Sequence, residues 1–214
     1  GRNAGHTPHL HMPTRSEVRE ALEAKLSDMA AEKRLPDNIT FAGNGEPTSH
    51  PDFLGIVEDT AALRSRYAPK ARISVLTNAT HILKPNVFKA LTLVENPLLK
   101  LDTVDLDYIR FVDRPTSRYD LPALIEQMKA FKGHCMIQTM FLEGTHEGRS
   151  VSNTSERYVG PWLETIQAIA PKLVTIYTID RETPDHDLRK AKPETLDAIA
   201  ERVRSAGIET TVSY

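Results

Sequence analysis

Two glycines and a carboxylate lie close together in one short segment, which consists of Gly43, Asn44, Gly45 and Glu46. Glycine reaches backbone conformations and close approaches that are closed to other residues, so the carbonyl and N–H groups of such a segment can face a ligand. The Glu46 carboxylate would accept hydrogen bonds from a cationic group such as an ammonium. A tight turn with a solvated glutamate explains the same residues equally well, because Asn-Gly is a common turn dipeptide.

Polar side chains also stand where other expected strands end. In parallel α/β folds the active site lies at the carboxyl ends of the strands, so we expect these residues to share one rim. They are Thr77 and Asn78, then Lys100 and Asp102, then Gln138 and Thr139, and finally Tyr177, Thr178, Asp180 and Arg181. Asp102 could accept from a ribose or sugar hydroxyl, or it could cap a helix, a role open equally to Asp105 or Asp107. Thr77 and Asn78 could bind a carboxylate or a hydroxyl, or they could close a turn.

The cysteine and histidine content argues against a metal centre made by this chain. Cys135 is the only cysteine and lies in an apolar stretch, which is typical of a small core residue. One cysteine forms no intrachain disulfide, which fits a reducing compartment such as the cytoplasm, and it cannot hold an iron–sulfur cluster. The histidines His6, His9 and His11 lie in a loop-like terminal stretch without a cysteine or carboxylate, so we expect no native metal site there.

Several function classes lack their sequence signatures here. The chain shows no G-x-x-x-x-G-K-[ST] or G-x-G-x-x-G motif, no nucleophile elbow and no Ser-His-Asp order. With 27 basic and 29 acidic side chains the net charge is 27 − 29 = −2, which gives no general argument for a nucleic-acid binder. No apolar run approaches the roughly 20 residues that span a bilayer, so no membrane partner is expected. Spacing alone supports a small-ligand site on a βα scaffold.

Alternating strands and helices must position these residues. Thr14 and Glu17 form a capping-box pattern that predicts a helix start, and the helix should stop before Pro36. Further helices are expected over residues 52–66, 85–91, 121–131, 158–169 and 193–204, with Gly207 as a C-cap. Strands are expected over residues 38–41, 72–76, 98–101, 135–141, 173–179 and 208–212, the first of them short and buried.

This alternation predicts an α/β fold with a parallel sheet of about six strands. A complete eight-fold barrel needs roughly 250 residues, so 214 residues favour a partial barrel or an open doubly wound sheet in a single domain. We expect residues 1–13 to be an irregular N-terminal segment and residues 207–214 to hold an extra C-terminal strand. The chain begins with Gly1, and its first predicted element is a helix, whereas parallel βα folds start with a strand. We therefore expect a strand and its loop upstream.

Five strings at these strand ends resemble, in the correct order, motifs of radical S-adenosylmethionine enzymes. The resemblance is closest to the iron–sulfur oxidoreductase branch related to the wyosine-forming tRNA enzymes, and it covers roughly residues 14–206. The strings are ITFAGNGEPTSHPDF at residues 39–53, VLTNA at 75–79, LKLD at 99–102, IQTMFLEG at 137–144 and IYTIDR at 176–181.

The resemblance implies a partial (β/α)6 TIM-like barrel with S-adenosylmethionine bound across the strand ends. Glu46 would take the amino group of this cofactor, and the backbone from Gly43 to Gly45, including Asn44, would line that edge. Asp102 would suit a ribose hydroxyl, and the backbone around Thr178 could meet the adenine. Contacts to the cofactor or the substrate are further expected from Thr77, Asn78 and Gln138.

One departure from the family is large, because its defining C-x-x-x-C-x-x-C loop is absent from these 214 residues. In the family this loop holds a [4Fe-4S] cluster, which reductively cleaves S-adenosylmethionine to a 5′-deoxyadenosyl radical that abstracts hydrogen from a substrate. The loop is expected before Gly1, so the chain as it stands should be inactive. The resemblance also implies an electron donor, and it leaves tRNA or protein open as the substrate. A cluster-free barrel that binds a small ligand or acts as a scaffold, and an unrelated α/β enzyme, are the alternatives.

Overall fold

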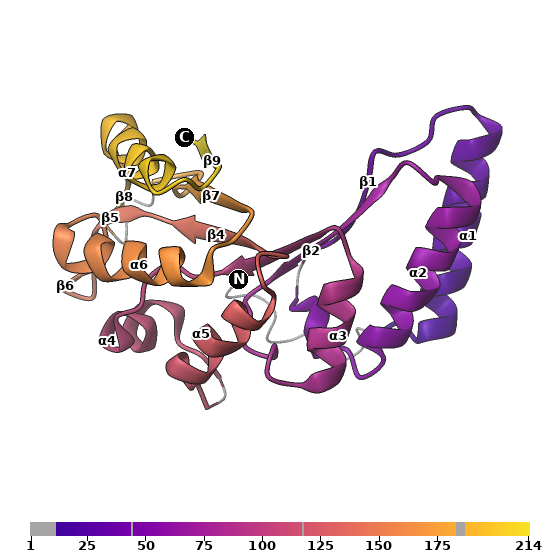
Figure 1. Ribbon diagram of the computed structural model, residues 1–214, viewed down its shortest axis with the longest axis horizontal. Coiled ribbons are helices and arrows are strands. Elements are labelled where there is room, and N and C mark those ends of the chain that lie inside the picture. Colours follow the sequence, from indigo (N-terminus) through magenta and orange to yellow (C-terminus); the bar gives the residue numbers. More distant parts are fainter. Residues whose placement is uncertain (1–11, 44, 117, 183–186) are drawn as a thin grey trace. The chain divides into compact units, whose positions relative to one another are not determined.

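The computed structural model describes residues 12–43, 45–116, 118–182 and 187–214. Strands and helices alternate along the chain (Figure 1). The main sheet has six strands in the order β1-β2-β3-β4-β7-β9, and β1 with β2, β3 with β4, β4 with β7 and β7 with β9 pair in parallel. Its strands are β1 (Asn38–Phe41), β2 (Arg72–Thr77), β3 (Asn96–Lys100), β4 (Met136–Met140), β7 (Leu173–Tyr177) and β9 (Thr210–Ser213). The predicted α/β class with a parallel sheet is confirmed.

The longer helices lie where the apolar spacing predicts them, with shifts of a few residues at their ends. They are α1 (Arg15–Ala31), α2 (Phe53–Tyr67), α3 (Pro85–Leu93), α5 (Leu121–Ala130), α6 (Glu156–Ile169) and α7 (Pro193–Ser205). Thr14 is the N-cap of α1, and its hydroxyl accepts a hydrogen bond from the Glu17 N–H at 3.1 Å. Gly207 follows α7 with φ +83°, as a C-terminal glycine should. None of the helices among the described residues combines the length and the apolarity that crossing a bilayer requires.

The chain divides into two compact units, which we describe separately. The first consists of Gly1–Thr77 and Lys84–Pro97, and the second of Asn78–Leu83 and Leu98–Tyr214. The single domain expected from the sequence stays a prediction.

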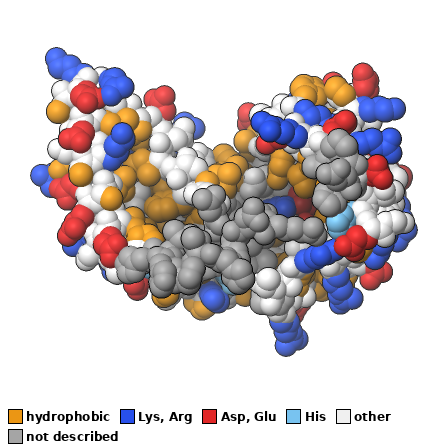
Figure 2. All heavy atoms as spheres, turned by 180° about the vertical axis from the view of Figure 1, so that it is seen from behind, with side chains coloured by type: hydrophobic (Ala, Val, Ile, Leu, Met, Phe, Trp, Pro, Cys, Tyr) orange, Lys and Arg blue, Asp and Glu red, His pale blue; other side chains and the backbone are white. Residues whose placement is uncertain are grey.

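In the first unit α1 packs along α2 (Figure 1). Leu26 of α1 and Leu63 of α2 are buried in one apolar cluster, and Arg15 forms a two-pronged ion pair with Asp59 at 2.8 and 2.9 Å. The expectation of a buried first strand is wrong, because the side chains of β1 alternate between exposed and half-buried. The strand stands first in the order, so among the described residues it pairs only with β2. Hydrophobic side chains also show at the surface of this unit (Figure 2).

In the second unit α5 and α6 lie side by side (Figure 1). Trp162 of α6 is buried with its ring edge-to-face against Phe141, at 5.3 Å between ring centroids. The indole N–H donates to the Leu101 carbonyl at 3.0 Å and also lies 3.2 Å from the Thr139 hydroxyl. One buried aromatic residue thus ties α6 to the ends of β3 and β4, where the polar residues of this unit stand.

Several short elements in the structure have no counterpart among the predicted ones. They are the 3₁₀ turn η1 (Pro47–Ser49), the helix α4 (Leu106–Tyr108), the π-helix η2 (Ile109–Asp113) and a small antiparallel sheet of β6 (Arg149–Ser150), β5 (Leu142–His146) and β8 (Leu188–Lys190). Gly144 is required in β5, since it has φ +111° and a Cβ there would lie 1.8 Å from the Asp187 carbonyl oxygen. Elements of two to five residues are too short to show a hydrophobic period.

Candidate functional site

The carboxylate of Glu46 joins the ends of β1 and β2 in the first unit. Glu46 caps the turn η1, and its Oε2 accepts from the Thr48 N–H at 3.1 Å and from the Thr48 hydroxyl. The Thr77 hydroxyl, at the last residue of β2, donates to the same oxygen at 2.6 Å. Both threonines are 2% exposed, while Glu46 is half-buried. The structure therefore brings together two of the predicted residues, and it holds the carboxylate in one orientation.

Close packing does not explain the two glycines that precede Glu46, but the backbone conformation explains one of them. Gly43 has φ +136°, a conformation that other residues rarely adopt, whereas Gly45 has no such constraint. A Cβ at either position would meet no atom within 4 Å, and both residues are exposed. Asn44 lies outside the described residues. Both glycines thus leave the backbone next to Glu46 open to a ligand.

A largely apolar cavity of about 470 Å³ adjoins this segment. Gly45 and Glu46 line it at the end of β1, and Val18 of α1 and Ile56 of α2 contribute to its walls. A carboxylate at the border of an apolar cavity suits a ligand that combines a cationic group with apolar atoms.

Asp102, Lys100 and Asp113 form a partly buried charged cluster in the second unit. Asp102 is 5% exposed, and its Oδ1 accepts from the Met140 N–H at 2.8 Å. Lys100 Nζ lies 3.2 Å from Asp102 Oδ2 and 3.8 Å from Asp113 Oδ1. No hydrogen bond reaches Oδ2 from any described residue, so Lys100 compensates this oxygen as an ion-pair partner.

Burial and charge act against each other in this cluster. Burial raises the pKa of Asp102 more than Lys100 and the Met140 N–H lower it. Burial, and then repulsion from Asp102, raises the pKa of Asp113 to about 6. For Lys100 burial lowers the pKa, but attraction to Asp102 and Asp113 outweighs it, so the pKa rises. At neutral pH the cluster therefore keeps its ammonium and has a carboxyl group that can take up a proton under mildly acidic conditions.

The other predicted residues of this unit make contacts within the protein. Asn78 Oδ1 accepts from the N–H and the hydroxyl of Thr80, at 3.0 and 2.8 Å, which is the turn considered as its alternative role. Gln138 of β4 pairs in register with Lys100 of β3. Thr178 is 5% exposed, and its hydroxyl accepts from the Ala191 N–H at 2.9 Å. A role of these residues toward a ligand stays a prediction.

The sequence left helix capping open as a role for Asp102, and in the structure Asp105 takes this role. Asp105 caps α4, because its Oδ1 accepts from the Tyr108 N–H at 2.9 Å. Asp102 instead faces Lys100 and Met140. Its role toward a ribose hydroxyl stays a prediction, and a ribose would have to share a carboxylate that already has partners inside the chain.

Asn153 supports the backbone beside Asp102, and the sequence reasoning missed it. Its side chain is fully buried, and its Nδ2 donates to the carbonyls of Asp102 at 3.2 Å and of Met140 at 2.9 Å. Its Oδ1 accepts from the Leu142 N–H at 3.0 Å. An asparagine between two elements has no periodic signal, so only the structure reveals that it holds the backbone of Asp102.

The thiol content does not fit an iron–sulfur cluster. Cys135 is fully buried, and burial raises the pKa of its thiol to about 12, so the thiolate that would ligate iron is disfavoured. The described residues hold no group of three or more histidine, cysteine, aspartate or glutamate side chains that could bind a metal ion. The histidines His6, His9 and His11 lie outside the described residues.

Comparison with curated proteins finds distant relatives, and no family model matches the chain. The chain is 22% identical over 165 residues to the GTPase Obg of Brachyspira hyodysenteriae, which covers 75% of this chain and 22% of that protein. It is 28% identical over 152 residues to a UPF0026 protein of Synechocystis, which covers 69% of this chain and 52% of that protein. The chain thus spans about half of one relative and less than a quarter of the other.

Solved structures share the fold over nearly the whole chain. A radical SAM methyltransferase from Sphaerobacter thermophilus is 16% identical with a TM-score of 0.67, covering 94% of this chain and 57% of that one. A domain of pyruvate-formate lyase-activating enzyme from Bacteroides vulgatus is 14% identical with a TM-score of 0.61, covering 84% of this chain and all of that one. Archaeal TYW1 is 13% identical with a TM-score of 0.58, covering 96% and 68%. These likenesses establish an α/β fold like the partial barrel of radical SAM enzymes.

Proposed function

We propose that this chain is the core of a radical S-adenosylmethionine enzyme, which binds its cofactor at the carboxyl ends of the strands. The observation that carries the proposal is the Glu46 carboxylate, held at the end of β1 by Thr48 and by Thr77 from the end of β2. A carboxylate fixed in this way accepts an ammonium without first losing side-chain freedom. The likeness of the fold to radical SAM enzymes supports the same assignment.

Each predicted residue has a role in this proposal. Glu46 accepts the ammonium of S-adenosylmethionine, and the backbone of Gly43 and Gly45 lines the same edge; Asn44, proposed with them, lies outside the described residues. Thr77 is a positioning residue, since it orients Glu46. The contacts proposed for the remainder of the cofactor or for the substrate come from Asn78, Asp102, Gln138 and Thr178.

The radical step requires more than these residues supply. Reductive cleavage of the sulfonium takes an electron from a [4Fe-4S] cluster, and such a cluster needs several thiolates. This chain has one cysteine, and it is buried. The thiolates would have to come from residues outside these 214, together with an electron donor. We therefore propose that the chain by itself binds the cofactor without cleaving it.

The same lack of thiolates favours a second candidate function, a cluster-free barrel that binds a small ligand. The experiment that separates the two uses the protein encoded by the complete gene, reconstituted with iron and sulfide and reduced with dithionite. Formation of 5′-deoxyadenosine from S-adenosylmethionine, and its loss in Glu46→Gln, are the results expected of a radical enzyme. A complete protein that takes up no iron and forms no 5′-deoxyadenosine would favour the binding module.

A further inference from the structure

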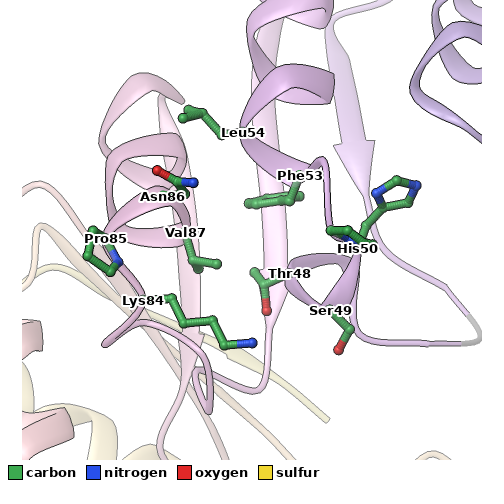
Figure 3. Close-up of a pocket in the computed structure, with 10 residues that line it drawn as sticks. Thr48, Ser49, His50, Phe53, Leu54, Lys84, Pro85, Asn86 and Val87 are labelled. Atoms are coloured by element: carbon green, nitrogen blue, oxygen red, sulfur yellow. The ribbon is translucent and has the colours of Figure 1, made fainter.

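A second cavity in the first unit has the chemistry of an anion site. It has a volume of about 280 Å³, and it lies between the segment that leads into α2 and the start of α3 (Figure 3). Phe53 and Leu54 of α2 and Val87 of α3 provide apolar walls. Lys84 and Asn86 provide polar groups, and Lys84 reaches toward Thr48 and Ser49 across the mouth of the cavity (Figure 3).

Among the described residues of this lining, Lys84 is the one that carries a full positive charge. It forms no ion pair with any described residue, and the lining contains neither aspartate nor glutamate. The lining histidine, His50, is used inside the fold: its Nδ1 accepts from the Asp52 N–H at 2.9 Å, and its Nε2 donates to the Pro13 carbonyl at 2.7 Å. Both ring nitrogens of His50 are therefore engaged within the fold. The net charge of the cavity lining is positive.

The backbone adds to this positive character. The first residues of α2 and of α3 both line the cavity, and neither helix has a side-chain cap at its N-terminus. The N–H groups of a first helical turn favour a negative group in front of them. Pro85 has no N–H, and the Phe53 N–H donates to the His50 carbonyl at 3.1 Å, so this contribution comes from the residues that follow Pro85 and Phe53. A cation without an ion-pair partner among the described residues and two helix starts without a side-chain cap thus line one cavity that also has apolar walls.

We propose that this cavity binds a small organic oxyanion, a carboxylate or a phosphate monoester with an apolar part. The oxyanion pairs with Lys84, and the apolar part lies against Phe53 and Val87. The cavity is near the lower end of the size range of small-molecule sites, roughly 300–1,000 Å³, so the ligand is small. None of the residues proposed to contact the cofactor lines this cavity, although Thr48, which anchors Glu46, does. The proposal requires no radical chemistry.

The test is an NMR titration of the 214-residue chain, labelled with nitrogen-15, at constant ionic strength. The probes are inorganic phosphate, phenyl phosphate, acetate and benzoate, which separate the type of oxyanion from the apolar contribution. We expect saturable shifts of the Ser49, Leu54, Asn86 and Val87 amides. We also expect tighter binding of the aromatic probes, by about tenfold, since ring burial contributes more than 1 kcal/mol.

Lys84→Gln and Lys89→Gln form the matched pair of variants. Both lysines are exposed and lie at or in α3, but Lys89 does not line the cavity. Lys84→Gln should weaken binding about tenfold, since it removes a charge-assisted hydrogen bond, and Lys89→Gln should leave it unchanged. Thermal melts of both variants check the fold. Shifts that do not saturate, shifts away from the cavity, or equal affinities of the two variants would overturn the proposal.

Discussion

The hydroxyl of Thr77 donates a 2.6 Å hydrogen bond to Oε2 of Glu46, and this contact connects the ends of β1 and β2. Thr48 donates to the same oxygen from its N–H and its hydroxyl. A carboxylate with one oxygen anchored in this way is pre-oriented for a cationic ligand, because the cost of ordering the side chain is already met by folding. The proposed cofactor role of Glu46 rests on this arrangement.

Replacing Thr77 with valine removes the hydroxyl and keeps the shape of the side chain. Loss of one hydrogen bond to a charged group should lower the affinity for S-adenosylmethionine by about tenfold, on the order of 1.4 kcal/mol. Calorimetric titration measures this. The control is Thr92→Val, at an exposed threonine of the same unit whose hydroxyl donates to the Lys89 carbonyl. If both variants bind as the wild type does, Thr77 does not position Glu46.

Removal of the Asn153 side chain should destabilise the second unit strongly. Asn153→Ala leaves the carbonyls of Asp102 and Met140 and the N–H of Leu142 without their buried partner, so we expect a loss of about 2–4 kcal/mol in the free energy of unfolding. Asn153→Asp keeps the acceptor for Leu142 but loses both donated bonds, so its loss should also be large. Urea denaturation measures both. A loss below about 0.5 kcal/mol for Asn153→Ala, the range of ordinary surface substitutions, would contradict this role.

Asp113 should make stability depend on pH between about 4 and 6. Its pKa in the folded protein is about 6, above the ordinary aspartate value near 3.9, so the folded state binds more protons than the unfolded state in this range. Stability from this group is therefore present below pH 4 and is lost as the pH rises through 6. The side chain is 26% exposed, so we expect a change on the order of 1 kcal/mol.

The difference in unfolding free energy between wild type and Asp113→Asn, measured at pH 4 and pH 7, isolates this contribution. Asp107→Asn, at an exposed aspartate of α4, is the matched control for removal of a carboxylate. A carboxyl carbon NMR titration reads the pKa of Asp113 directly. A value near 4 would show that burial and Asp102 do not act on it as the structure indicates.

Gly144→Ala and Gly148→Ala test the small antiparallel sheet. Both glycines have positive φ, at +111° and +74°, but only at Gly144 would a Cβ meet another atom within 4 Å, the Asp187 carbonyl group. Gly148→Ala should therefore cost about 1 kcal/mol from backbone strain, and Gly144→Ala should cost several kcal/mol and disrupt the pairing of β5 with β8. Thermal unfolding compares them. Equal costs would contradict the close approach of Asp187 to β5.

The fold was predictable from the sequence where side chains repeat with a long period. Phe53, Ile56, Val57 and Leu63 of α2 are all buried, as their helical spacing predicts. The burial of β1 was mispredicted, because four residues without alternation do not show whether another element covers them. The strands β5, β6 and β8 were missed since a strand of two to five residues carries almost no pattern.

The candidate site was predictable only in part, for a similar physical reason. The meeting of Glu46 with Thr77 follows from the rule that parallel strands end at one edge of a sheet. Asp113 lies near Lys100 because it ends the π-helix η2, an element without a regular sequence signal. Asn153 contacts Asp102 from a loop. Such contacts depend on tertiary folding and not on local spacing, so the sequence contains no direct sign of them.

Titration of S-adenosylmethionine into the 214-residue chain, followed by calorimetry, tests the central claim most directly. The chain should bind the cofactor, and Glu46→Gln should weaken binding roughly ten- to a hundredfold, because a hydrogen bond between charged groups contributes about 1.5–3 kcal/mol. The matched control Glu20→Gln, at an exposed glutamate of α1, should bind as the wild type does. Equal affinities of wild type and Glu46→Gln would contradict the assignment of Glu46 as the residue that receives the cofactor's ammonium.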